Sequence, residues 1–255
     1  MIKFSANLGF LWTDLSLIDA IYKAKKHGFD AVELQWPYEI NPIDIKNVLA
    51  ETMLPVLGIN TLKGNIEKGD FGLAAIKGRE TEAREYIAQA IEYADIAGIK
   101  NVHVMAGKAD LSAKSLTTFL DNLKFAKDLS VSKGINIIIE PLNRRDVPGY
   151  FLTEIEQAKE ICELVDQDNV KIMFDCYHVQ INQGDVLKRF QDNVLNIGHV
   201  QIASLPDRGE PDFGELNFKH LLPQFYKAGY EGYIGGEYRP RTNTEEGLSW
   251  LKTLK

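Results

Sequence analysis

The stretch "VSKGINIIIEPL", residues 131–142, joins the end of a predicted helix to an apolar strand through a glycine. Gly134 suits the left-handed position just past a helix C-terminus. The same order of helix, glycine and strand occurs at Gly28, Gly98 and Gly229. Repeated junctions of this kind are typical of an α/β fold with parallel strands.

Eight predicted strands alternate with amphipathic segments, at residues 2–8, 31–35, 56–60, 101–105, 135–140, 170–175, 197–202 and 233–237. The segment that ends at Gly98 has helical periodicity, with an apolar face of Ala83, Ile87, Ala90, Ile91 and Ala94. Most strands are apolar throughout, which predicts a buried parallel sheet, and eight strands close a TIM barrel. We therefore expect a single-domain (β/α)8 TIM barrel over residues 1–255. An open dinucleotide-binding sheet is disfavoured because no GxGxxG follows a strand.

The composition limits the function classes. The chain has 255 residues, of which 45% are hydrophobic and 25% charged, as in globular proteins. Its net charge of −7 argues against nucleic acid as a partner, and no apolar stretch reaches the roughly 20 residues that cross a bilayer. The N-terminal residues lack a signal-peptide pattern, and Cys162 and Cys176 form no CxxC pair. We expect a cytoplasmic protein with free thiols that binds no nucleic acid and no membrane; the sequence allows a homo-oligomer.

Four consecutive strands end in oxygen-bearing side chains, each about one βα unit apart: Glu140, Asp175, Gln201 and Glu237. The carboxyl ends of barrel strands meet on one face, so inward-pointing residues there converge. Converging carboxylates repel one another unless a cation lies among them or protons bind. Singly, each residue is more often a helix cap or an ion-pair partner. Together they predict a site for Mg²⁺ or Mn²⁺, which prefer oxygen ligands.

Two further residues lie near this site in the sequence. His178 follows Asp175 by three residues, on a predicted loop, and can polarise a substrate oxygen or move a proton near neutral pH. Arg208, in the loop after the Gln201 strand, can hold a substrate carboxylate bidentately. The alternative for both is an ordinary structural or surface residue. With them, the site suits a small α-hydroxycarbonyl acid.

Three other residues are expected to have structural roles. His199 lies two residues before Gln201, so it points inward one layer deeper in the barrel. Gly235 leaves space beneath Glu237. His27 lies at the predicted C-terminus of a helix, where its ring is favourable.

A series of motifs runs in order along nearly the whole chain: "KFSANL" (3–8), "GRE" (78–80), "IEPLN" (139–143), "DCYH" (175–178), "GHVQIA" (198–203), "RGEP" (208–211), "GGEYRP" (235–240) and "TEEGLSWL" (244–251). With these motifs the chain resembles the hydroxypyruvate isomerases of the xylose isomerase-like TIM-barrel superfamily. It departs from that family at Ser204 and at "DFGE" (212–215), which bears on substrate preference and not on the metal site.

The resemblance implies that Glu140, Asp175, Gln201 and Glu237 hold a divalent metal and that Glu140 and Glu237 also form the acid/base pair. Relatives that epimerise ketoses often have His in place of Gln201. The implied reaction interconverts hydroxypyruvate and tartronate semialdehyde through an enediolate. Alternatives are a 2-oxotetronate isomerase, a ketose epimerase and a non-catalytic sugar-acid binding protein. An apurinic-site endonuclease is disfavoured, because it would need more histidine ligands and a basic face.

Overall fold

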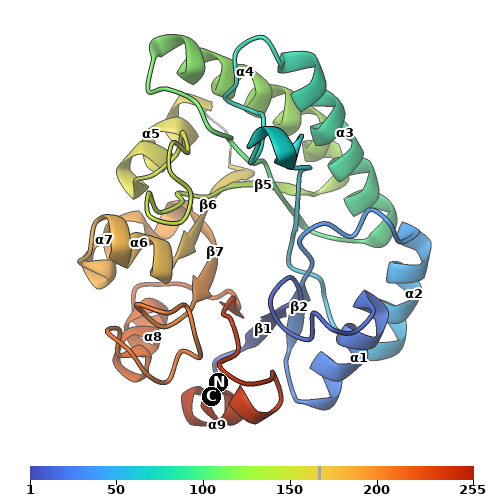
Figure 1. Ribbon diagram of the computed structural model, residues 1–255, viewed down its shortest axis with the longest axis vertical. Coiled ribbons are helices and arrows are strands. Elements are labelled where there is room, and N and C mark those ends of the chain that lie inside the picture. Colours follow the sequence, from blue (N-terminus) through green and yellow to red (C-terminus); the bar gives the residue numbers. More distant parts are fainter. Residues whose placement is uncertain (166–167) are drawn as a thin grey trace.

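The computed structural model describes residues 1–165 and 168–255, and Figure 1 shows helices arranged around a central set of strands. All strand pairs are parallel, in the order β2-β1-β8-β7-β6-β5-β4-β3. The strands are β1 (Phe4–Asn7), β2 (Ala31–Glu33), β3 (Ile59–Asn60), β4 (Asn101–His103), β5 (Asn136–Ile139), β6 (Val170–Asp175), β7 (Ile197–Ile202) and β8 (Ile234–Gly236). The expected α/β fold, a (β/α)8 TIM barrel, is confirmed.

The barrel closes between β2 and β3 through backbone that is only partly regular. Val32 and Val56 form an isolated parallel bridge. The Leu34 amide donates to the Gly58 carbonyl at 3.0 Å, and the Asn60 amide donates to the Gln35 carbonyl at 2.9 Å. These bonds satisfy the two edges that an open sheet would leave unpaired.

The helices cover the outside of the strands (Figure 1). They are α1 (Leu17–Lys26), α2 (Pro42–Thr52), α3 (Glu80–Ala97), α4 (Ala113–Ser130), α5 (Ile155–Val165), α6 (Cys176–Asn182), α7 (Val186–Asn193), α8 (Phe218–Lys227) and α9 (Ser249–Leu254). Short 3₁₀ helices lie at η1 (Ile66–Lys68), η2 (Val131–Lys133), η3 (Val194–Asn196) and η4 (Glu246–Leu248). The predicted apolar face of α3 is buried at all five of its residues. No helix within the described residues is long and apolar enough to cross a membrane.

The junction glycines have the left-handed conformation that the sequence predicts. Gly98 ends α3 with φ 78°, and Gly134 ends η2 with φ 63°. Gly28 has φ 84° and follows His27, which is the C-cap of α1 as expected. Side chains with a Cβ rarely adopt this conformation, so glycine lets the chain turn directly from helix to strand.

Several strands are shorter than predicted. Pairing in β3 covers only two of the five predicted residues, and β4 ends at His103 and not at Met105. Val56 and Met105 are nonetheless buried. Apolar patterning predicts which residues are covered, whereas strand bounds depend on pairing, and pairing stops where the chain diverges into loops. In β6 and β7 the predicted bounds are correct.

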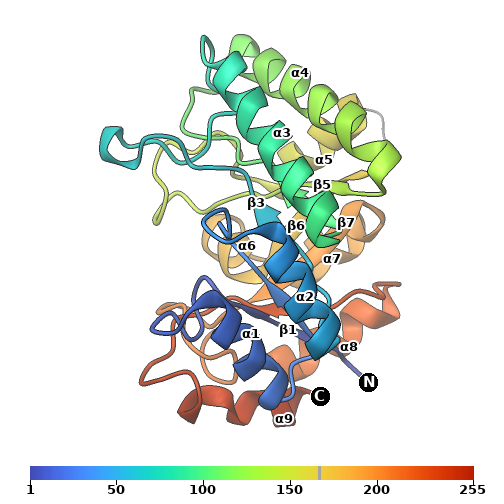
Figure 2. The same cartoon turned by 90° about the vertical axis from the view of Figure 1, so that its right-hand side faces the viewer.

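The loops that follow the strands lie on one side of the barrel. In Figure 2 the loop that contains η1 and the loop after β5 project to the left, whereas the N-terminus, which leads into β1, lies on the right. Because all strands are parallel, their carboxyl ends face these loops. This side of the barrel carries the candidate site.

Candidate metal and substrate site

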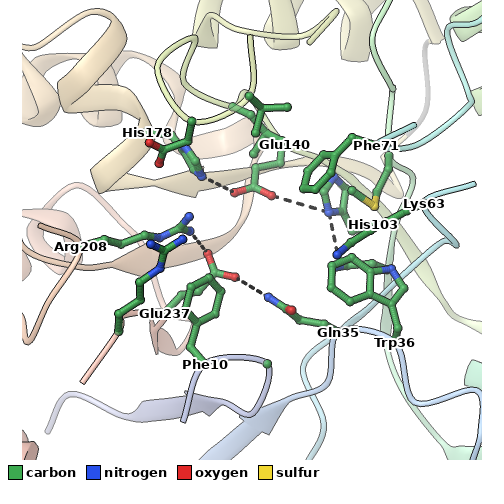
Figure 3. A pocket seen from close by; sticks show the side chains of 17 residues that line it. Phe10, Gln35, Trp36, Lys63, Phe71, His103, Glu140, His178, Arg208 and Glu237 are labelled. Carbon is green, nitrogen blue, oxygen red and sulfur yellow. Dashed lines mark hydrogen bonds and ion pairs between the residues drawn. The ribbon is translucent and has the colours of Figure 1, made fainter. Parts of the chain in front are cut away.

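The four strand-end residues converge as the sequence predicts. Glu140 and Glu237 each lie one residue past a strand, Asp175 ends β6, and Gln201 is the last residue but one of β7. Glu140, Asp175 and Glu237 offer ligand atoms that lie, together with one from His178, within 4.8 Å of one another. The carboxylates of Glu140 and Glu237 line a cavity of about 270 Å³ (Figure 3).

Asp175 has two roles, one for each oxygen. Its Oδ1 accepts a hydrogen bond from the Tyr177 amide at 2.8 Å and caps α6. Its Oδ2 lies 3.3 Å from Nη2 of Arg208, within the buried cluster. The helix-cap interpretation is therefore correct, and the same residue also lies in the buried carboxylate cluster.

His178 lies in the first turn of α6, and the prediction that it lies on a loop is wrong. The helix begins directly after Asp175 because that side chain caps it. Nδ1 of His178 accepts from the Asn143 amide at 3.0 Å, so in the neutral ring the proton is on Nε2. Burial lowers the pKa of His178 well below its usual value and keeps it neutral. Nε2–H then faces Asp175 Oδ2 at 3.5 Å and Glu140 Oε1 at 3.8 Å and is not available as a metal ligand.

Gln201 can supply a ligand atom for a cation, which the protonated Nε2 of His178 cannot. Its Nε2 donates to Glu33 Oε2 at 2.7 Å. Its Oε1 is buried and has no hydrogen-bond partner among the described residues, and the same is true of Glu140 Oε1. Buried polar atoms without partners are costly, and a bound cation would satisfy both.

The electrostatics of the cluster also fit a divalent cation. Burial raises the pKa of Glu140 well above its usual value, with further contributions from Glu237 and Asp175. Burial likewise raises the pKa of Asp175, and it raises that of Glu237 to about 7 although Arg208 opposes the shift. Three carboxylates and one guanidinium carry a net charge of −2 when ionised. The donor set of carboxylate and amide oxygens is that of a hard divalent ion.

Arg208 lies in the site, as predicted. The contacts that hold it there are with the protein's own carboxylates. Its Nη2 donates to Glu237 Oε2, and its guanidinium lies 4.8 Å from the ring centroids of Phe10 and Tyr177. Its Nε is buried without a hydrogen-bond partner among the described residues. Arg208 has φ 56°, an uncommon value for a residue with a side chain, so the loop is strained where it presents this group.

The two glutamates differ in their surroundings. Oε1 of Glu237 accepts from Asn7 Nδ2 at 2.9 Å and from Gln35 Nε2 at 3.2 Å, as Figure 3 shows for Gln35. Oε1 of Glu140 has no such donor in the part of the chain that the structure describes. The ring nitrogens of His178 and His103 lie 3.6 to 3.8 Å from the Glu140 carboxylate. Hydrogen bonds therefore fix the Glu237 carboxylate, whereas no hydrogen bond from the described residues restrains Glu140 Oε1.

Sequence reasoning missed several residues of the site. Glu33, Asn7 and His103 each end a strand, so the rule that identified Asp175 applies to them as well. His103 lies 3.6 Å from Glu140 Oε2, and burial lowers its pKa to about 3. Burial also favours a neutral Glu33, but His199, Ser5 and Gln201 outweigh this and lower its pKa.

Lys63 was also missed, and no strand-end signal marks it, because it lies on the long loop after β3. Its Nζ lies 3.6 Å from the ring centroid of Trp36 and 5.3 Å from that of Phe71. Burial lowers its pKa. In Figure 3 Lys63 and Arg208 lie on opposite sides of the pocket, so cations line it on both sides.

His199 has the buried position that the sequence predicts, whereas Gly235 makes space for Glu33 and not for Glu237 as expected. His199 Nε2 lies 3.0 Å from Glu33 Oε1, deep in the barrel. A Cβ on Gly235 would lie 2.2 Å from Glu33 Oε1, so glycine makes space here for a carboxylate.

The fold and the site together define a TIM-barrel protein with an oxygen-rich cation site at the carboxyl ends of its strands. Residues 21–254 match the family model described as xylose isomerase-like TIM barrel. The chain belongs to this family.

The relatives and a solved structure agree with this family. The chain is 42% identical to the 2-oxo-tetronate isomerase of Cupriavidus necator, with 99% of the chain and 98% of the relative covered. It is 37% identical to the hydroxypyruvate isomerase of Escherichia coli, with 98% of each covered. It superposes on a structure from Brucella melitensis described as AP endonuclease, family 2, with TM-score 0.96, 36% identity and both chains fully covered. The sequence-based assignment to the hydroxypyruvate isomerase family is confirmed.

Proposed function

We propose that this protein is a divalent-metal-dependent isomerase that interconverts hydroxypyruvate and tartronate semialdehyde. The observation that carries the proposal is the buried cluster of Glu140, Asp175 and Glu237. Gln201 is the strand partner of Asp175, and its Oε1 has no hydrogen-bond partner among the described residues. Relatives with isomerase names, matched along nearly their whole length, support the reaction class. The expected partner is then a small hydroxy-keto acid, and not nucleic acid, since the chain carries a net charge of −7.

Glu140, Asp175, Gln201 and Glu237 would hold Mg²⁺ or Mn²⁺ through oxygen atoms. A cation held there would supply Lewis-acid chemistry, because it would polarise the carbonyl and hydroxyl oxygens of the substrate and offset negative charge that develops on them. His178 presents Nε2–H on the same side as Asp175 Oδ2 and Glu140 Oε1, where it can donate to a substrate oxygen. Because this ring stays neutral, its role is to polarise and not to carry the proton.

The two glutamates are proposed to exchange the substrate protons. Glu140 removes the C3 proton of hydroxypyruvate, because its Oε1 lacks a donor among the described residues and its pKa is raised. Glu237, which is protonated at the start of this step and is fixed by Asn7 and Gln35, returns its proton to C2, and the proton of the C3 hydroxyl passes to the C2 oxygen so that the aldehyde forms. Arg208 holds the substrate carboxylate, for which its Nε is suited because it has no hydrogen-bond partner within residues 1–165 and 168–255.

A four-carbon acid is the second candidate substrate, because the relative at 42% identity is named a 2-oxo-tetronate isomerase. The chemistry at the reacting carbons is the same for both acids. Comparing kcat/KM for hydroxypyruvate, 2-oxotetronate and free ketoses separates these cases. A preference for free ketoses would contradict the carboxylate-binding role of Arg208.

The decisive experiment is proton NMR in D₂O with hydroxypyruvate, with and without Mg²⁺. We expect loss of the C3 proton signals and formation of tartronate semialdehyde only with the metal. Binding without exchange would indicate a sugar-acid binding protein. Incision of an abasic DNA duplex, tested because of the description of the Brucella melitensis structure, would instead indicate an endonuclease.

A further inference from the structure

A hydrogen-bonded carboxylate lies beneath the carboxylate cluster, in the interior of the barrel. Glu33, the last residue of β2, is buried. Oε1 of Glu33 accepts from Ser5 Oγ on β1, and Oε2 accepts from Gln201 Nε2 on β7 at 2.7 Å. His199 on β7 adds Nε2 at 3.0 Å from Oε1. Glu33 thus links strands that are not all neighbours, across the barrel interior.

The contact with Gln201 selects one orientation of its amide. A glutamine amide has nearly the same shape in both orientations, but one end only donates and the other only accepts. An ionised carboxylate only accepts, so it binds the NH₂ end and repels the oxygen. Oε1 of Gln201 is therefore turned away from Glu33, and it is buried without a partner among the described residues.

Two neighbours support the position of Glu33. Nδ2 of Asn7 lies 3.4 Å from Glu33 Oε2 and 2.9 Å from Glu237 Oε1, while its own Oδ1 accepts from the Gly9 amide at 3.0 Å. The backbone bond fixes which end of this amide faces the carboxylates. A Cβ at Gly235 would lie 2.2 Å from Glu33 Oε1, so the fold leaves space for this carboxylate.

We propose that Glu33 is a positioning residue that fixes the amide of Gln201, so that Oε1 stays available to the divalent cation. This role rests on the proposed function, because it assumes that Gln201 is a ligand. Glu33 itself touches neither substrate nor cation. It acts through Gln201, and groups that orient metal ligands in this way usually contribute roughly 10- to 100-fold to metal affinity.

The test is titration of the full-length protein with Mn²⁺, with free Mn²⁺ measured by electron paramagnetic resonance. Glu33→Gln removes the preference for one amide orientation and should weaken Mn²⁺ binding by roughly tenfold or more. The exchange variant Glu33→Gln/Gln201→Glu restores a donor-to-carboxylate contact and leaves a carboxylate oxygen for the cation. We expect it to bind Mn²⁺ about as tightly as the wild type. Ser5→Ala is the matched control, because it removes a donor to Glu33 but leaves the contact with Gln201.

The outcomes separate this role from the proposed function. Wild-type affinity in Glu33→Gln, or no recovery in the exchange variant, would overturn the role of Glu33 alone. If the wild type fails to bind Mn²⁺, the proposed function and this role fail together. If Glu33→Gln does not fold, Glu33→Asp replaces it, since the shorter side chain keeps the charge but withdraws from Gln201. Unchanged Mn²⁺ affinity in Glu33→Asp would also overturn the role.

Discussion

At the scale of single residues, two side chains of the site each make a local contact with one polar atom and face the site with the other. Asp175 caps α6 with Oδ1 and faces Arg208 with Oδ2. His178 accepts a backbone hydrogen bond at Nδ1, which leaves Nε2–H for the site. In both residues the local contact determines what the other atom can do, because it fixes either the orientation or the tautomer.

Glu140 and Glu237 should differ when each is changed to Gln. Glu140→Gln is expected to lower turnover by roughly 1,000-fold or more and to abolish solvent exchange of the C3 proton, because the proposed base is lost. Glu237→Gln should also abolish product formation but retain C3 exchange. Proton NMR in D₂O measures both processes in one sample.

The matched control is Glu85→Gln, a change of the same kind on the exposed side of α3. It should leave exchange and turnover unchanged. Retained exchange in Glu140→Gln together with lost exchange in Glu237→Gln would reverse the proposed roles.

Lys63 should contribute to the binding of the anionic substrate. Its ammonium is half-buried between aromatic rings at the pocket, so its charge is screened less than that of an exposed lysine. Lys63→Met is expected to raise KM for hydroxypyruvate roughly tenfold with little change in kcat. Lys68→Met, on the exposed η1 segment of the same loop, is the control. Equal KM effects in both variants would show that only net charge matters.

At the scale of elements, the junction between helix and strand repeats around the barrel. A glycine with positive φ ends α3 at Gly98, and Gly134 ends η2 in the same way. The turn directs the next strand into the sheet with its carboxyl end toward the site loops. The carboxyl ends of β5 to β8 thereby bring the four candidate ligands together.

Replacement of Gly98 should destabilise this junction. Gly98 has φ 78°, and a Cβ at this position would meet open space, so Gly98→Ala introduces backbone strain without a clash. We expect a loss of about 1–2 kcal/mol in the free energy of unfolding, measured by urea denaturation. Gly58→Ala is the control, because Gly58 lacks a positive φ and its Cβ would make only an ordinary contact at 3.6 Å. Equal losses in both variants would contradict the strain argument.

At the scale of the whole molecule, the barrel holds unfavourable charge in its interior. Three carboxylates with raised pKa values lie at the carboxyl ends of β5, β6 and β8. Folding brings them together against their repulsion, and the core of apolar residues around them supplies the compensating stability. The stability of the metal-free protein should therefore depend on pH and on added metal, and the two effects should be linked because protons and metal bind the same carboxylates.

Stability of the metal-free protein should fall as the pH rises. A carboxyl group with a folded pKa above its unfolded value binds protons more tightly in the folded state, so stability is lost between the unfolded pKa and the folded pKa, about 7 for Glu237. Mg²⁺ should raise Tm by roughly 5 °C more at pH 8 than at pH 5.5, because it competes with protons for the same oxygens. Thermal unfolding in EDTA and in Mg²⁺ measures this. An equal Tm shift at both pH values would contradict the linkage. Glu140→Gln should reduce the difference between the two Tm shifts.

The barrel and its four strand-end residues could be predicted from the order of amino acids alone. Helix periodicity, junction glycines and apolar strands are local signals, and topology then makes strand ends converge wherever the registers are correct. The contacts around those residues became visible only in the folded chain. Glu33 and Gln201 are 168 residues apart, and the tautomer of His178 in α6 depends on the Asn143 amide in the loop after β5. No local sequence pattern indicates such pairings, because the partners are far apart in the chain and come within contact distance only when the barrel closes.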